Sequence, residues 1–171
     1  SPLTPPIVAE LRQRFAASAD NDDAVFMKVG ASSTVSPSNM TCFHGNGYDL
    51  GPYVDLQATI DFFRMGDAAG TSPFARETIA ARVGHSARWV IGGDPSPLQQ
   101  EIDAIAPRFA FVHYGTNDMG LGSTYASAMK PFYESMLTLI IELLDQGIIP
   151  IVVSIAARGD REKADQWVGT Y

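Results

Sequence analysis

Two short polar stretches contain the residue types that acyl-transfer chemistry requires. Residues 30–34 read GASST and residues 115–118 read GTND, and each stretch follows an apolar run. A hydroxyl held at the end of a strand, with free backbone amides beside it, is the arrangement that a serine nucleophile needs. A neutral amide such as that of Asn117 can donate to the oxyanion that the attack creates. Taken alone, the GASST stretch is also typical of an ordinary Ser-rich turn.

The elements that would position these stretches alternate between strands and helices. Apolar runs predict strands at residues 24–29, 109–114 and 148–155, and helical spacing of apolar residues predicts helices at 7–19, 97–106 and 125–146. Weaker patterns predict a strand at residues 58–63, a helix from Ser72-Pro73 to Gly84 and a further helix at 160–168.

Strands that are apolar throughout and alternate with helices indicate a parallel sheet covered on both faces. We therefore expect one α/β domain over residues 1–171, with three α/β/α layers and a flavodoxin-like sheet. Open α/β sheets bind their ligands at the carboxyl ends of the strands. This rule predicts that Ser32 and Asn117 face one cleft.

Composition excludes several classes of partner. The chain has 171 residues and a net charge of −7, which argues against general affinity for nucleic acid or for an anionic membrane. Its apolar runs are all shorter than a membrane span, so we expect a soluble protein. The first residue is Ser and no apolar leader precedes it, so we expect a processed chain with a secreted or periplasmic location. The single cysteine, Cys42, cannot form an internal disulfide.

The two polar stretches resemble the first and third sequence blocks of the SGNH hydrolases, also called the GDSL esterase/lipase superfamily, and they occur in the family's order. The resemblance implies a flavodoxin-like fold in which Ser32 is the nucleophile and Asn117 belongs to the oxyanion hole. A second-block glycine completes that hole. It is best matched by Gly84, although Gly92 and Gly93 lie nearby.

The chain also departs from the family pattern. Ala31 stands where the first block usually has an acidic residue, and the fifth block, Asp-x-x-His, is absent. Without that histidine, no obvious group deprotonates Ser32. We therefore expect the chain to lack its C-terminal strand and helix, with the catalytic His and Asp beyond Tyr171, on a remaining segment that could be a separate piece.

Three histidines are present, and each has a non-catalytic interpretation. His113 is expected to be a hydrogen-bonded strand histidine that lines the floor of the site. His44 lies in the loop after Ser32, and His85 follows Gly84 and would contact substrate. No pair has the spacing of metal ligands, and we expect neither a metal nor a cofactor.

The sequence leaves two main hypotheses. The first is a serine ester hydrolase that acts on small-molecule or carbohydrate esters with small acyl groups, acetyl esters among them, through an acyl-enzyme. The second is a non-catalytic SGNH-like binding or structural domain, suggested by Ala31 and the missing base. A flavodoxin-like phosphate or flavin binder ranks third, because the strand-end loops lack a basic residue.

Overall fold

Three parallel strands form the centre of the molecule. The computed structural model describes residues 3–157 and 164–171, and its sheet has the order β1 (Asp22–Gly30), β2 (Pro107–His113) and β3 (Ile149–Val152). On the other side of β1, Gly30 forms a parallel bridge with Ala81. The segment around Ala81 therefore lies beside β1, on the side away from β2, as in a flavodoxin-like sheet.

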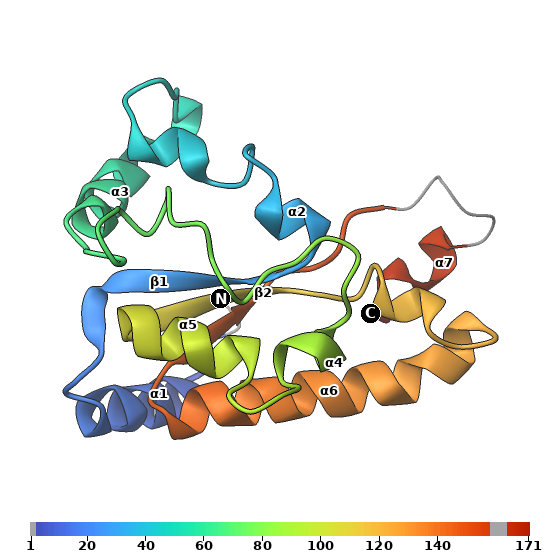
Figure 1. Cartoon of the computed structure of the whole chain (residues 1–171). Helices are drawn as coiled ribbons and strands as arrows, with labels where there is room; N and C mark the ends of the chain where they lie inside the picture. Colours follow the sequence, from blue (N-terminus) through green and yellow to red (C-terminus); the bar gives the residue numbers. More distant parts are fainter. Residues whose placement is uncertain (1–2, 158–163) are drawn as a thin grey trace.

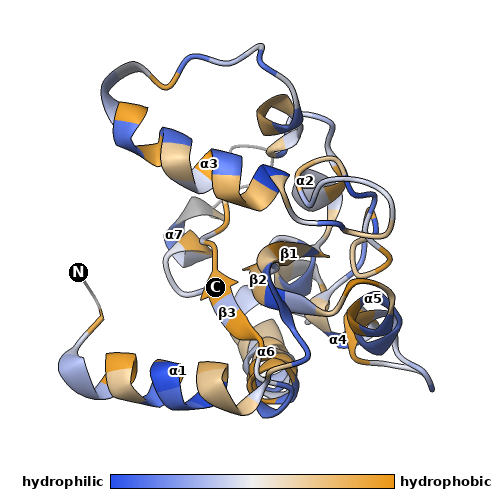
Figure 2. Ribbon diagram, turned by 90° about the vertical axis from the view of Figure 1, so that its left-hand side faces the viewer, coloured by the Kyte–Doolittle hydropathy of each residue, from blue (hydrophilic) through white to orange (hydrophobic). Residues whose placement is uncertain are grey.

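Helices cover both faces of this sheet (Figures 1 and 2). One face carries α1 (Pro5–Ala17), α4 (Ala87–Val90), α5 (Pro97–Ile105) and α6 (Tyr125–Asp145). The other face carries α2 (Ser32–Val35) and α3 (Gln57–Arg64), joined by a long connection with the short 3-10 helices η1 (Thr41–His44) and η2 (Gly51–Leu56). A third 3-10 helix, η3 (Asp118–Gly120), precedes α6, and α7 (Asp165–Val168) follows the sheet. The fold is α/β, as predicted.

Alternation along β1 divides the core into two clusters. Val25, Met27 and Val29 point to the face that is covered by α5 and α6, where Leu98, Ile102, Leu139 and Leu143 are also buried. Phe26 points to the opposite face. It makes edge-to-face contacts with Phe63, Phe74 and Phe111, at centroid distances of 5.3, 5.1 and 5.2 Å.

Most of the predicted elements are confirmed, with ends shifted by a few residues. The strands at 24–29, 109–114 and 148–155 correspond to β1, β2 and β3, and the helices at 7–19, 97–106 and 125–146 correspond to α1, α5 and α6. Of the helix predicted at 160–168, residues 160–163 lie outside the described residues, and α7 occupies the remainder.

Two predicted elements are wrong. Residues 58–63 belong to helix α3, because Ile60 and Phe63, three positions apart, pack together against the sheet while Phe62 is exposed. Residues 72–84 form turns instead of a helix, and the expected inner residues Ile79 and Val83 are 41% and 61% exposed. The Ile79 N–H donates to Glu101, and Ala80 and Arg82 bond to Gly30, so these backbone groups are not available to a helix.

Arg108 joins α1 to the start of the sheet. Its guanidinium, which is almost fully buried, donates to the carbonyl oxygens of Phe15, Ser18, Asn21 and Gly147 and to the carboxylate of Asp23. A buried cation is tolerated only when its donors are satisfied in this way. The contact was not foreseen, since Arg108 precedes an apolar run and has no local pattern.

Gly147 ends α6 in a conformation that a side chain would disturb. Its φ is +69°, and a Cβ there would meet the Ser18 Oγ at 1.3 Å. We expect Gly147→Ala to lower the free energy of unfolding by about 1–3 kcal/mol in urea titrations. Gly45→Ala is the matched control, because Gly45 has an ordinary φ of −98° and open space at its Cβ. Equal unfolding midpoints for the two variants would contradict the expectation.

Candidate functional site at the carboxyl edge of the sheet

The last residue of β1, Gly30, pairs with two chain segments at once. It lies opposite His113 in β2, and on its other side its N–H donates to the Ala80 carbonyl at 3.2 Å while its carbonyl accepts from the Arg82 N–H at 3.1 Å. Neighbouring strands lie about 4.8 Å apart. Three segments therefore leave the sheet side by side.

Each candidate catalytic residue follows one of these paired positions within four residues. Ser32 comes two residues after Gly30, Gly84 three after Ala81 and Asn117 four after His113. The register thus brings the three predicted site residues to one edge, although they are far apart in the sequence. Their catalytic roles remain predictions.

Ser32 is the first residue of α2 and is exposed to solvent. The turn that presents it is held by the Ala31 carbonyl, which accepts from the N–H groups of Thr34 and Val35 at 3.0 Å each. Ala31 itself is buried in the core cluster. Backbone bonds and burial of a methyl group therefore order this turn, at the position where the family pattern has a carboxylate.

Gly84 lies in an exposed turn with a φ of +77°, a left-handed conformation that favours glycine. The turn is closed by the His85 N–H, which donates to the Arg82 carbonyl at 3.3 Å. Within the described part of the chain, the N–H groups of Gly84 and Ser32 have no acceptor. Both amides are available as donors at this edge.

The side chain of Asn117 connects the second and third stretches. Its Nδ2 donates to the His85 carbonyl at 2.9 Å, and the His85 ring packs edge-on against Trp89 with centroids 4.9 Å apart. An amide nitrogen carries two hydrogens. One therefore fixes the orientation of Asn117 beside Gly84, and the second can donate elsewhere.

Asp118 joins the turn after β2 to the start of α4. Its carboxylate is 2% exposed and accepts from the N–H groups of Ala87, at 3.0 Å, and Gly115, at 3.2 Å. Burial raises the pKa of Asp118, and these backbone N–H groups oppose the shift. Burial, with the nearby Asp118 charge, also raises the pKa of Tyr114 well above its ordinary value. The bond to the first residue of α4 is a link that the sequence did not show.

The histidines differ from one another in their contacts. The His44 Nδ1 lies 2.8 Å from the Ser72 Oγ, and the His85 Nδ1 lies 2.9 Å from the Val83 carbonyl oxygen. His113 is half-buried, and burial lowers the pKa of its imidazole. Among the described residues its imidazole has no hydrogen-bond partner, so the side-chain bond expected for this strand histidine does not form within the described part of the chain.

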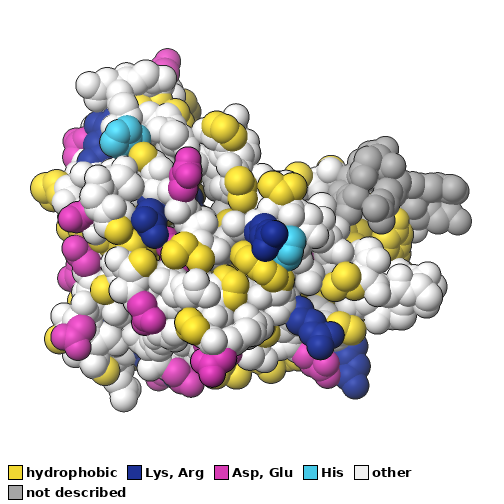
Figure 3. Space-filling model, viewed as in Figure 1, with side chains coloured by type: hydrophobic (Ala, Val, Ile, Leu, Met, Phe, Trp, Pro, Cys, Tyr) yellow, Lys and Arg dark blue, Asp and Glu magenta, His cyan; other side chains and the backbone are white. Residues whose placement is uncertain are grey.

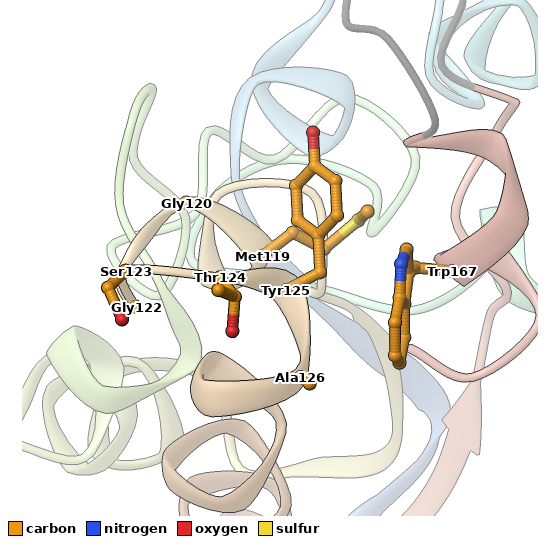
Figure 4. A pocket seen from close by; sticks show the side chains of 8 residues that line it. All are labelled: Met119, Gly120, Gly122, Ser123, Thr124, Tyr125, Ala126 and Trp167. Atoms are coloured by element: carbon orange, nitrogen blue, oxygen red, sulfur yellow. The ribbon is translucent and has the colours of Figure 1, made fainter.

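Two pockets lie next to the site, and neither was found from sequence. One, of about 450 Å³, begins at Met119 and Gly120, just after Asn117, and contains the aromatic rings of Tyr125 and Trp167. Figure 4 shows these rings at the start of α6 and in α7, and their centroids are 6.4 Å apart. The other, of about 420 Å³, begins at Thr34, on the side of Ser32 away from β2. Tyr125 and Trp167 are far apart in the sequence, so no local sequence pattern indicated the first pocket.

Within residues 3–157 and 164–171, no three His, Cys, Asp or Glu side chains gather in a way that could hold a metal ion. In the same ranges, no helix has the length and apolar character to cross a bilayer. Compared with protein-family models, with curated proteins and with solved structures, the chain shows no match.

The buried carboxyl of Asp118 makes a pH-dependent contribution to stability. Its pKa is raised above the ordinary 3.8, so the folded state favours the protonated form more than the unfolded state does. The contribution is therefore full below pH 3.8 and declines as the pH rises through the folded-state pKa.

We expect Asp118→Asn to lower the free energy of unfolding by about 1–3 kcal/mol near pH 4, because its NH₂ group would face a backbone N–H. The difference from the wild type should shrink as the pH rises, because the Asn side chain does not titrate. Urea titrations across this range test it, with the exposed Asp103→Asn as a control for loss of one charge. A difference that grows with pH would contradict the assignment.

Proposed function

We propose that the chain forms the nucleophile and oxyanion-hole part of a serine ester hydrolase of the SGNH type. The observation that supports this most directly is the double pairing of Gly30, together with the bond from Asn117 to the His85 carbonyl. These contacts put a serine hydroxyl, two free backbone amides and one side-chain amide at a single strand edge. Such donors are what acyl transfer requires.

The proposed reaction has two steps. The Ser32 Oγ attacks the ester carbonyl carbon as its proton passes to a general base, and a tetrahedral oxyanion forms. The N–H groups of Ser32 and Gly84 and the Nδ2 of Asn117 donate to that oxyanion. The C–O bond to the alcohol then breaks, the proton goes to the leaving oxygen, and water hydrolyses the acyl-enzyme by the same route.

The resemblance implies that the general base is the histidine of an Asp-x-x-His segment, which residues 1–171 do not contain. In the described structure β3 is an edge strand, and in a sheet of this kind the next parallel strand would lie against it. We propose that this segment docks there, whether it is continuous with the chain or a separate piece. Neither His44 nor His85 is proposed as the base, because the Nδ1 of His44 contacts Ser72 and the Nδ1 of His85 contacts Val83.

A non-catalytic SGNH-like binding domain is the second candidate. Two observations favour it: Ala31 occupies the usual acidic position, and the Asn117 amide already has a partner in the His85 carbonyl. The two candidates differ in whether Ser32 is reactive. A fluorophosphonate probe that labels the full-length protein at Ser32, and not the Ser32→Ala variant, would argue against the binding domain.

Ser32→Ala tests the nucleophile. In the full-length protein we expect hydrolysis of 4-nitrophenyl acetate to fall by about 10³-fold or more, because no other group can form the acyl-enzyme. Ser33→Ala is the matched control, since Ser33 is an exposed neighbouring hydroxyl in the same short helix. Equal rates for the wild type and Ser32→Ala would refute the proposed function.

Asn117 is tested by its effect on turnover. We expect Asn117→Ala and the isosteric Asn117→Asp to lower kcat by about 10²–10³-fold with little change in KM, because the donor acts mainly on the developing oxyanion. Both variants also lose the bond to the His85 carbonyl, so thermal unfolding should be measured alongside. A change in KM alone, with kcat intact, would show that Asn117 only positions substrate.

A further inference from the structure

The pocket that begins at Thr34, two residues after Ser32, is lined by two cationic side chains. It lies between the start of the long α2–α3 connection and the turns at residues 75–81, on the side of β1 away from β2. Its walls combine two cationic side chains, several hydroxyls and one carboxylate, contributed by Lys28, Arg76, Thr34, Thr41, Thr78 and Glu77. None of these residues has a role in the proposed oxyanion hole.

Near this pocket, two cationic side chains, Lys28 and Arg76, lie close to a single buried carboxylate, that of Glu101. Lys28 is 6% exposed, and its Nζ donates to the Phe74 carbonyl at 3.0 Å. Arg76 binds both oxygens of Glu101 at 3.2 Å, and Glu101 is 0% exposed. Two cations thus share one buried anion, whose carboxylate also accepts the Ile79 N–H at 2.9 Å.

Burial lowers the pKa of Lys28, and the nearby Glu101 charge only partly offsets this effect. The ammonium group therefore lacks a full counter-charge. An anion in the pocket would stabilise the protonated form of Lys28. Of the three hydrogens on an ammonium, one is used by the Phe74 carbonyl, and the others remain available to an acceptor in the pocket.

The pocket also lies close to Ser32 along the chain. Its wall begins at Thr34, Val35 and Ser36, and the Ser36 N–H donates to the Ser32 carbonyl at 3.1 Å across one turn of α2. One helical turn advances about 5.4 Å. The wall of the pocket therefore begins within about one turn of α2 from Ser32.

A local cationic pocket is distinctive on this chain, whose net charge is −7. Figure 3 shows acidic side chains spread over the left and lower parts of one face of the molecule. Glu77 is exposed at the rim of the pocket, where water screens its charge, whereas Lys28 and Glu101 are desolvated. The field inside the pocket is therefore set mainly by the buried groups.

We propose that this pocket binds a carboxylate carried by the substrate, so that the preferred esters are those of acidic molecules such as uronic acids. The inference rests on the proposed function for the position of the ester, but binding of the carboxylate itself does not require catalysis. Lys28 supplies the charge, and the Thr78 hydroxyl supplies a further donor.

Binding can be measured without any turnover. D-Galacturonate and D-galactose share a ring and differ at the carboxylate, so NMR chemical-shift titrations of the full-length protein should show saturable shifts around residues 28–41 and 75–81 with galacturonate only. Acetate is the third probe. Acetate binding as tight as galacturonate binding would indicate a site for free anions and would overturn the proposal, as would equal binding of the two sugars.

Thr41 offers a matched pair of variants, because it is exposed at the pocket wall and its hydroxyl already donates to the Asn39 carbonyl. We expect Thr41→Glu to weaken galacturonate binding by about tenfold through repulsion of like charges, and the neutral Thr41→Gln to leave it almost unchanged. Lys28→Met should remove binding while the protein stays folded by circular dichroism. Equal affinities for Thr41→Glu and Thr41→Gln would refute the proposal even if Lys28→Met fails to fold.

The outcomes for the two proposals can be separated. Should Ser32→Ala hydrolyse esters at the wild-type rate while galacturonate still binds and Thr41→Glu weakens it, the carboxylate pocket stands and the esterase fails. Conversely, loss of hydrolysis in Ser32→Ala with no difference between galacturonate and galactose would keep the esterase and reject the pocket.

Discussion

The close approach of backbone at Gly30 is the constraint on which the whole site depends. A Cβ at this position would meet the Thr34 Oγ1 at 2.0 Å and the His113 carbonyl oxygen at 2.8 Å. Only glycine allows β1 to pair with β2 on one side and with the segment at Ala81 on the other while Thr34 folds back over it. The GASST stretch therefore begins with glycine for a packing reason that is separate from any chemistry at Ser32.

Buried carboxylates, rather than regular secondary structure, hold the loops around that point. Asp118 accepts the N–H groups of Gly115 and Ala87, and Glu101 accepts the N–H of Ile79 and binds Arg76. A backbone donor that is buried outside a helix or sheet must find an acceptor, and a carboxylate can satisfy two or more. The use of carboxylates also puts charge in the interior: Glu101 is buried, Arg76 pairs with it, and Lys28 lies nearby.

Local patterns explain which elements could be predicted from sequence. Strand β1 and helix α6 are specified by their own residues, since apolar runs and helical spacing do not depend on distant partners. Residues 72–84 begin with Ser72-Pro73 and show helical spacing, but Glu101 and Gly30 take their backbone groups into tertiary bonds. Propensity is a weak prior where such partners exist.

For the candidate site, motifs in the sequence indicated Ser32, Gly84 and Asn117, and the register brings the segments that carry them to one edge of the sheet. The charged pocket had no motif, because Lys28 sits inside an otherwise apolar strand, where a lone cation gives no hint of Glu101 from α5.

The position of Ala31 bears on the choice between an enzyme and a binding domain. In the family pattern a carboxylate helps to order the loop before the nucleophile, and its loss would be expected to free that loop. Here the Ala31 carbonyl accepts two N–H groups, and its methyl group lies in the core cluster. The turn at Ser32 is therefore ordered by backbone bonds and by burial of the Ala31 methyl group, and Ala31 is a weak argument against the role proposed for Ser32.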